Sequence, residues 1–114
     1  MPLATVRKHF EAFNEGDLDG LLALFAESAT FVTGETSASS RGELSDLFGP
    51  AMRDLLPHLE VLVMVGEGEV VACQLRETLT FHGERLTFEI AAFFVVSDGL
   101  IAHGKVYREG SSEL

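Results

Sequence analysis

In the first quarter of the chain, apolar residues recur at the spacing of two short helices. Val6, Phe10 and Phe13 lie at positions i, i+4 and i+7, which predicts the apolar stripe of one helix. This helix can end at Asn14-Glu15-Gly16, because glycine readily takes the left-handed conformation that closes a helix. Asp17 is a good N-cap for a second helix, so the chain should begin with a helical hairpin. The apolar face expected for the second helix consists of Leu21, Leu22, Leu24 and Phe25.

The next segment predicts a strand, a polar loop and a third helix. Residues 29–33 (ATFVT) fit a short strand, whereas residues 34–42 (GETSASSRG) are too polar and glycine-rich to pack, which favours a mobile loop. Pro50 would mark the start of the third helix or a kink in it, and Pro57 would mark its end. The residues that keep helical spacing in this segment are Leu44, Leu47, Phe48, Met52, Leu55 and Leu56.

From Leu59 onward, apolar and polar residues alternate with a period of two. Four such runs, LEVLVMV, EVVACQLRETLTFH, ERLTFEIAAFFVV and LIAHGKVYR, are separated by the turn sequences GEG, HG and SDG. Turns this short predict a four-stranded antiparallel meander. No internal repeat or linker interrupts the chain, so helices followed by a curved sheet predict one α+β domain over residues 1–114, with the helices closing one face of the sheet.

The central hairpin has a register that can be read from its turn. A tight turn at His82-Gly83 would pair Phe81 with Glu84 and Glu77 with Phe88. Glu77 then shares its face with apolar side chains of both strands. The apolar members of this face are Leu75, Leu79 and Phe81 on the first strand and Leu86, Phe88, Ile90, Ala92, Phe94 and Val96 on the second.

Glu77 is therefore the first candidate for chemistry. A carboxylate on an apolar face is unfavourable unless it is paired, hydrogen-bonded or protonated, and burial without a partner would raise its pKa to a range useful for an acid or a base. Two interpretations stay open. In the first, Glu77 has a structural role, either near the rim of the sheet or paired with a cation such as Arg108. In the second, Glu77 is a proton-transfer group.

Composition narrows the possible partners and surroundings. The chain has 8 Lys and Arg against 18 Asp and Glu, a net charge of −10, so it should repel the phosphates of nucleic acids. No run approaches the roughly 18 apolar residues of a membrane span, and the start of the chain does not fit a signal peptide. The single cysteine, Cys73, can form no intrachain disulfide, which favours a cytoplasmic location. Cys73 itself should be a small buried residue.

Metal and cofactor motifs are not found in the sequence. The four histidines, His9, His58, His82 and His103, show no HxH or HExxH spacing, so no metal site is expected. There is no glycine-rich phosphate loop, GxSxG elbow or nucleotide fingerprint, and the expected chemistry needs no cofactor.

The order of elements and two motifs resemble the nuclear transport factor 2-like superfamily, especially its SnoaL-like and ketosteroid isomerase-like branches. The motifs are HFEAFNEGDLDGLLALFAESATF near the start and FFVVSDGLIAHGKVY near the end. The resemblance covers nearly the whole chain. It implies a cone-shaped cystatin-like roll, in which three N-terminal helices pack on a strongly curved, mostly antiparallel sheet and enclose an apolar pocket. The same fold hosts isomerases, polyketide cyclases, epoxide hydrolases, dehydratases and proteins without catalysis.

Residue by residue, the resemblance argues against steroid-type isomerisation. In register with the family, His9 takes the place of the oxyanion-hole tyrosine, Thr33 that of the aspartate base and Ala92 that of the protonated aspartate. Threonine and alanine cannot carry the proton at neutral pH. His9 is either a partly exposed surface histidine or, as the family register favours, a pocket donor or proton shuttle near neutral pH.

Two functions follow from these expectations. The first is an enzyme that acts on a small hydrophobic molecule, with Glu77 and His9 as catalytic residues. The second is a non-catalytic ligand-binding or dimerisation module of the same fold. The expected ligand pocket consists of Phe13, Phe31, Thr33, Leu75, Leu79, Phe81, Phe88, Ile90, Ala92, Phe94 and Arg108.

The opposite face of the sheet is expected to be a homodimer interface. His103, Lys105 and Tyr107 share one face of the last strand, and by register with the family this is the convex face, on which such domains commonly dimerise. The outer set is too apolar for a surface that is wholly exposed to water. It consists of Thr78, Glu89, Ala91, Phe93, Val95 and Tyr107.

Overall fold

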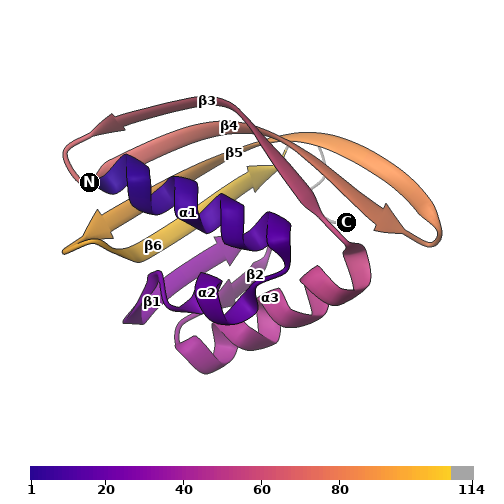
Figure 1. The fold of residues 1–114 in the computed structure, drawn as a ribbon, viewed down its shortest axis with the longest axis horizontal. Coiled ribbons are helices and arrows are strands. Elements are labelled where there is room, and N and C mark those ends of the chain that lie inside the picture. The colour runs from indigo at the N-terminus through magenta and orange to yellow at the C-terminus, as the bar shows by residue number, and fades with distance from the viewer. Residues whose placement is uncertain (109–114) are drawn as a thin grey trace.

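The computed structural model describes residues 1–108, which form three helices and one six-stranded sheet. The helices are α1 (Pro2–Glu15), α2 (Leu18–Leu22) and α3 (Arg41–Leu55). The strands are β1 (Phe25–Thr33), β2 (Thr36–Ala38), β3 (His58–Glu67), β4 (Val70–Phe81), β5 (Glu84–Ser97) and β6 (Leu100–Arg108). In Figure 1, α1 crosses one face of the sheet. α3 lies below β1 and β2 in the same view.

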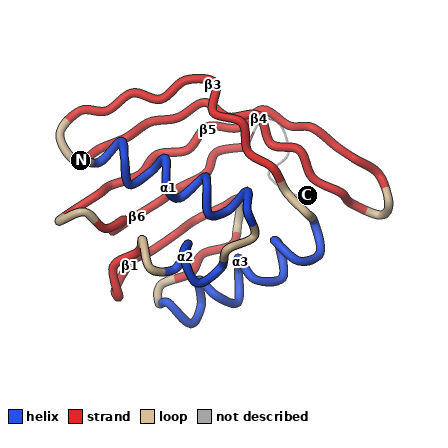
Figure 2. Tube along the Cα trace, in the orientation of Figure 1, coloured by secondary structure: helices blue, strands red, loops and turns tan. Residues whose placement is uncertain are grey.

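The sheet has the strand order β2-β1-β6-β5-β4-β3. Strands β3 to β6 form the predicted antiparallel meander, and the register of the central hairpin is the predicted one, with Phe81 opposite Glu84 and Glu77 opposite Phe88. β1 joins this meander in parallel beside β6, so the sheet is mixed. In Figure 2 the long β4–β5 hairpin extends past the helices and curves downward, toward the side of the sheet on which α3 lies.

The core lies between the helices and the concave face of this sheet. Its most deeply buried members come from every layer, and Cys73 is buried among them, as expected for a small apolar residue. The α+β class with helices on a curved sheet is therefore confirmed. The largest fully buried side chains are Phe25, Phe94, Leu21, Leu44, Leu75, Leu79, Ile101, Val6 and Val71.

The helical hairpin at the start follows the cap residues. Gly16 closes α1 with φ of 72°, and the Asp17 carboxylate accepts a hydrogen bond from the main-chain N–H of Gly20 at 2.9 Å. The assignment of Phe25 to the second helix is wrong. α2 ends at Leu22, and Phe25 begins β1 opposite Ile101. In this position the Phe25 side chain is fully buried in the core.

The expectation of a mobile loop over residues 34–42 is also wrong. β2 pairs with the end of β1, and Gly34 makes the tight turn between them with φ of 58°. The next residues form a capping box: the Ser40 hydroxyl accepts from the N–H of Glu43, and the Glu43 carboxylate accepts from the N–H of Ser39. α3 therefore starts nine residues before Pro50, which lies inside the helix.

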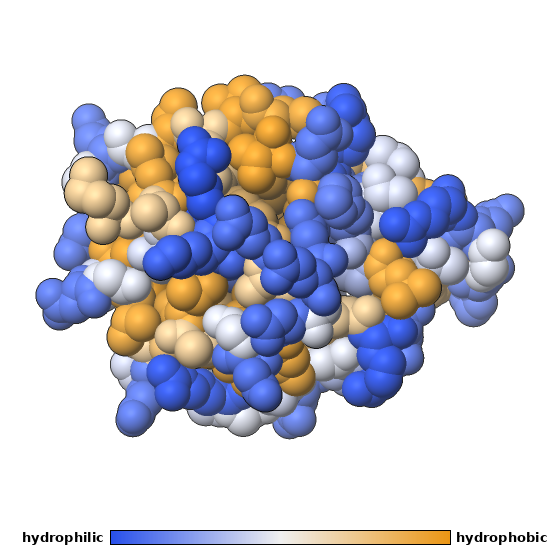
Figure 3. Space-filling view, in the orientation of Figure 1, coloured by the Kyte–Doolittle hydropathy of each residue, from blue (hydrophilic) through white to orange (hydrophobic). Residues whose placement is uncertain are grey.

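One side chain ties the end of α1 to the sheet. The Asn14 amide donates to the carbonyl of Leu59 at 2.9 Å and accepts from the N–H of Leu59 at 2.7 Å. These two bonds fix the first helix over the start of β3. Figure 3 shows a gathering of apolar side chains at the top of the view, and hydrophilic residues interspersed with smaller apolar areas over the rest of the visible surface.

Candidate functional site

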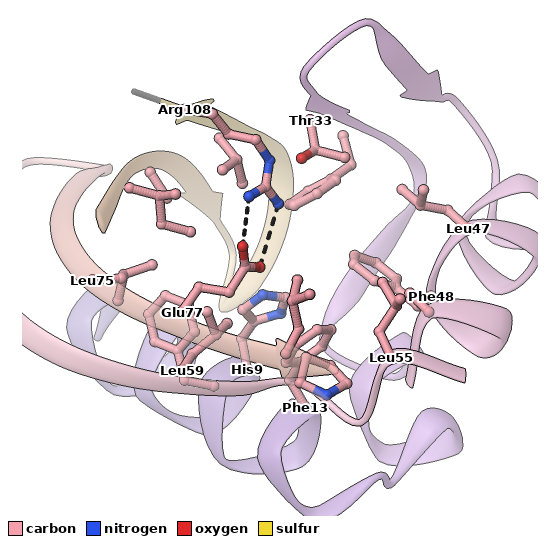
Figure 4. A pocket seen from close by; sticks show the side chains of 18 of the residues that line it. His9, Phe13, Thr33, Leu47, Phe48, Leu55, Leu59, Leu75, Glu77 and Arg108 are labelled. Carbon is pink, nitrogen blue, oxygen red and sulfur yellow. Dashed lines mark hydrogen bonds and ion pairs between the residues drawn. The ribbon is translucent and has the colours of Figure 1, made fainter. Parts of the chain in front are cut away.

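A cavity of about 100 Å³ lies between α1, α3 and the concave face of the sheet. Its walls are almost entirely apolar, and most of the side chains that line it are shown in Figure 4. The fully buried members are His9, Phe10, Phe31, Phe48, Leu59, Leu75, Glu77, Leu79, Ile90, Ala92 and Phe94. The half-buried members are Phe13, Thr33, Leu47, Ala51, Leu55, Pro57, Val106 and Arg108. The half-buried set comes mainly from α3, its link to β3 and the ends of β1 and β6, which places the rim of the cavity there.

Glu77 and Arg108 form an ion pair inside this cavity. Arg108 Nη1 lies 2.5 Å from Glu77 Oε1, and Nη2 lies 3.3 Å from Oε2, as the dashed lines in Figure 4 mark. Glu77 comes from β4 and Arg108 from β6, and the intervening strand places both on the concave face. Their side chains are only 8% and 14% exposed. The structure therefore has the pairing with Arg108 that the sequence left open.

This pair is buried but charge-balanced. A buried carboxylate that accepts two hydrogen bonds from a guanidinium keeps lone pairs free on both oxygens. Removing one partner would leave the other charge uncompensated in an apolar environment, which is usually more destabilising than replacing both. The pair thus gives the cavity a polar end without giving it a net charge.

His9 faces the same cavity from α1. Its side chain is only 3% exposed, and six phenylalanine rings surround it with centroid distances from 5.1 to 6.5 Å. Burial lowers the pKa of His9 to about 3. The alternative of a partly exposed surface histidine is wrong, and so is that of a proton shuttle near neutral pH, because the ring stays neutral at pH 7. A neutral imidazole can still donate one hydrogen bond and accept another.

One ring nitrogen of His9 is sealed inside this aromatic cage. Among the described residues, Nδ1 of His9 is the only buried side-chain nitrogen or oxygen without a hydrogen-bond partner. The second ring nitrogen, Nε2, is not such a sealed atom, and His9 lines the cavity. Because a sealed N–H without an acceptor is especially unfavourable, we place the proton on Nε2.

The model of the SnoaL-like domain family matches residues 6–104. The chain belongs to the SnoaL-like domain family. No curated protein matches the chain. Within the described residues, no helix is long and apolar enough to cross a membrane, and no three His, Cys, Asp or Glu side chains gather as metal ligands.

Solved structures of similar fold cover nearly the whole SnoaL-like domain. An NTF2-like protein of unknown function from Burkholderia pseudomallei has a TM-score of 0.87 at 17% identity, over 95% of this chain and 90% of that chain. An LEH-like epoxide hydrolase from M. tuberculosis has a TM-score of 0.85 at 17% identity, over 93% of this chain and 80% of that chain. SalBIII, an epoxide hydrolase/cyclase-like enzyme of pyran ring formation in the polyether salinomycin, has a TM-score of 0.86 at 22% identity, over 94% and 89%. At these identities the likeness is one of fold.

Most of the pocket predicted from the sequence lines the cavity of this SnoaL-like domain. Both proposed catalytic residues, Glu77 and His9, line this same cavity. The predicted pocket residues that line it are Phe13, Phe31, Thr33, Leu75, Leu79, Ile90, Ala92, Phe94 and Arg108. Thr33 and Ala92 thus lie in the cavity where the related isomerases were expected to have carboxyl groups, and neither can replace a carboxyl.

Two predicted pocket residues lie outside the lining. Phe81 is 39% exposed at the end of β4, and Phe88 is half-buried against the core. Phe81 lies at the turn of the β4–β5 hairpin, whereas Phe88 lies opposite Glu77, which does line the cavity. The alternation of a strand gives the face of a residue but not how far along the strand the helices reach.

Half of the lining residues that the sequence analysis did not predict come from α3. Leu47, Phe48, Ala51 and Leu55 recur at positions i, i+1, i+4 and i+8, which is the apolar stripe of a helix that faces a core. That stripe was available in the sequence as a helix signal. The remaining missed members are Phe10, Pro57, Leu59 and Val106.

Proposed function

We propose that this SnoaL-like domain binds a small hydrophobic molecule in the cavity between α1, α3 and the concave face of the sheet. The observation that carries the proposal is the lining, which is apolar except for His9, Thr33 and the Glu77–Arg108 pair. A preformed apolar cavity with a few convergent polar groups is the usual form of a small-molecule site. The buried single cysteine and the acidic surface fit a protein of the cytoplasm.

A second candidate function is cofactor-independent catalysis as an isomerase, cyclase or hydrolase. The specific observation that favours it is that Glu77 and His9 line one cavity. The lone pairs of Glu77 that Arg108 leaves free would accept a proton from the ligand or from a bound water. The Nε2–H of neutral His9 would donate a hydrogen bond to a ligand oxygen that gains negative charge. The names of similar structures, epoxide hydrolase and epoxide hydrolase/cyclase-like, fit chemistry of this kind.

Binding is tested first, with thermal-shift and NMR screens against hydrophobic ketones, lactones and epoxides. We expect members of the panel to raise the melting temperature and to perturb resonances of cavity-lining residues. A panel that perturbs only resonances of surface residues, or none, would overturn the proposed function.

Catalysis is tested next, on each bound compound, by following product formation. Glu77→Gln should abolish turnover and change binding little, because the amide can still accept from Arg108 but is no base. Glu89→Gln is the matched control, since Glu89 lies on the outer face and pairs with exposed Arg76. Turnover that survives in Glu77→Gln would remove the catalytic role and leave the binding role standing.

We also propose that two copies of the chain associate through the convex face of the sheet. Phe93 is 46% exposed and Tyr107 is 50% exposed on this face, and their rings meet edge to face with centroids 5.9 Å apart. Across the sheet, Phe93 lies in register with Ala72 and, one strand further, with Val65, which is also exposed. Together these residues form an apolar patch of the kind that interfaces cover.

The mass in solution tests this association. Light scattering coupled to size exclusion should give twice the 12.4 kDa of the chain, and Phe93→Lys should return the monomer mass. Phe81→Lys is the matched control, because Phe81 is exposed at the end of the hairpin rather than on the patch. A wild-type chain that stays monomeric at working concentration would contradict the proposal.

A further inference from the structure

The volume of the cavity limits what it can hold. At about 100 Å³ it is smaller than an engineered apolar cavity of about 150 Å³ that is known to bind benzene. A ligand of about one six-membered ring is therefore the largest that enters with small movements of the wall. Two fused rings would need the helices or the sheet to move apart.

The wall resists such movement because its aromatic rings are interlocked. Phe48 of α3 packs against Phe31 at 5.0 Å, Phe25 at 5.9 Å and Phe13 at 6.1 Å between ring centroids. These rings come from α1, α3 and β1, so widening the cavity at Phe48 disturbs three elements at once. Protein interiors are packed as densely as organic crystals, and a ring can move only if its neighbours do.

The charges in the cavity also restrict the ligand. Glu77 and Arg108 already satisfy one another, and His9 is neutral because burial lowers its pKa to about 3. Among the described residues that line the cavity, a carboxylate or ammonium on the ligand would find no free opposite charge, and it would lose its hydration in an apolar environment. An uncharged ligand carries no such penalty, and its oxygen can accept from Nε2–H of His9.

We propose that the cavity selects uncharged molecules of about single-ring size that carry one oxygen acceptor for His9, and excludes fused-ring and charged molecules. This inference rests on the proposed function, because it specifies the class of ligand for the same cavity. It follows from the cavity volume, the interlocked phenylalanine rings and the Glu77–Arg108 pair.

Four related probes separate size from charge. Cyclohexanone is neutral with one ring, 1-decalone is neutral with two, and cyclohexanecarboxylate and cyclohexylammonium carry one ring with a negative or a positive charge. Dissociation constants are measured from the methyl NMR shifts of Leu75 and Leu79, which line the cavity, with the exposed Leu100 as the surface control. Cyclohexanone should shift the leucine methyls saturably, and the other three probes should bind at least tenfold more weakly.

A variant with a larger cavity tests the size limit directly. Leu79→Ala removes part of the wall and should raise the affinity for 1-decalone at least tenfold, while the two charged probes stay weak. If Leu79→Ala does not fold, Leu55→Ala at the half-buried rim makes the same test. A variant that folds and gains no affinity for 1-decalone would overturn the size limit.

The outcomes distinguish this inference from the proposed function. 1-Decalone that binds the wild type as tightly as cyclohexanone, through the same leucine methyls, would overturn the size limit and leave the binding function intact. Either charged probe binding as tightly as cyclohexanone would overturn the exclusion of charge. If none of the four probes binds but other ketones, lactones or epoxides bind in the cavity, only this inference is overturned. If no compound binds in the cavity, the proposed function is overturned as well.

Discussion

Acidification should destabilise this protein through His9. The unfolded chain binds a proton at this residue with an ordinary pKa of about 6.5. In the fold, burial lowers the pKa of His9 to about 3, so the ring stays neutral. Between these two values the unfolded state holds more protons than the folded state, and the stability falls as the pH falls. From pH 7 to pH 5 the contribution of His9 to the free energy of unfolding should drop by about 2 kcal/mol.

The assay is urea denaturation at pH 7 and pH 5 for the wild type and His9→Leu. Carboxylates also titrate toward acid pH, so the informative quantity is the loss of stability in the wild type minus the loss in the variant. That difference should be about 2 kcal/mol. Substitution of the exposed His58 with Gln should leave the wild-type loss unchanged. Equal losses in wild type and His9→Leu would refute a neutral, sealed His9.

Three further predictions concern the frame of the cavity and are all measured by denaturant unfolding. Arg108→Met should lower the free energy of unfolding by roughly 3 to 5 kcal/mol because it leaves Glu77 unpaired, and adding Glu77→Gln should recover most of this loss. Equal stability of the single and double variants would contradict a buried ion pair. Gly104→Ala should destabilise by roughly 1 to 3 kcal/mol, because its Cβ would lie 2.7 Å from the ring of Phe31; no effect would mean that the ring moves freely. Asn14→Ala should lower the free energy of unfolding by roughly 1 to 3 kcal/mol, because it removes both hydrogen bonds to the main chain of β3. An unchanged free energy of unfolding would show that these bonds do not fix α1.

Much of the fold could be predicted because local signals and tertiary packing agree. The two-residue period and the HG turn determine the register of the central hairpin, and Gly16 and Asp17 mark the joint between the first two helices. Phe25 was misassigned because a short apolar run fits a helix end or a strand start equally well, and the core decides between them. β2 was missed because TSA carries no apolar alternation, although the Ser40 capping box was a usable signal for the start of α3.

The polar groups of the candidate site were harder to predict than its apolar wall. Alternation along β4 places Glu77 on the concave face, but whether a cation reaches it depends on how strands β4, β5 and β6 line up. Likewise, helical spacing cannot say whether His9 lies at the edge of the Phe10 stripe or inside it. The structure has it inside, because rings from α1, α3, β1 and β5 enclose the imidazole.

The central claim is that an uncharged ligand enters the cavity between His9 and the Glu77–Arg108 pair. A crystal structure of the protein with cyclohexanone tests it most directly, at a concentration that saturates the NMR shifts. We expect density for one ring inside the cavity, with the ketone oxygen within hydrogen-bond distance of His9 Nε2. Density for cyclohexanone only on the surface, with the cavity closed by its phenylalanine side chains, would contradict the account.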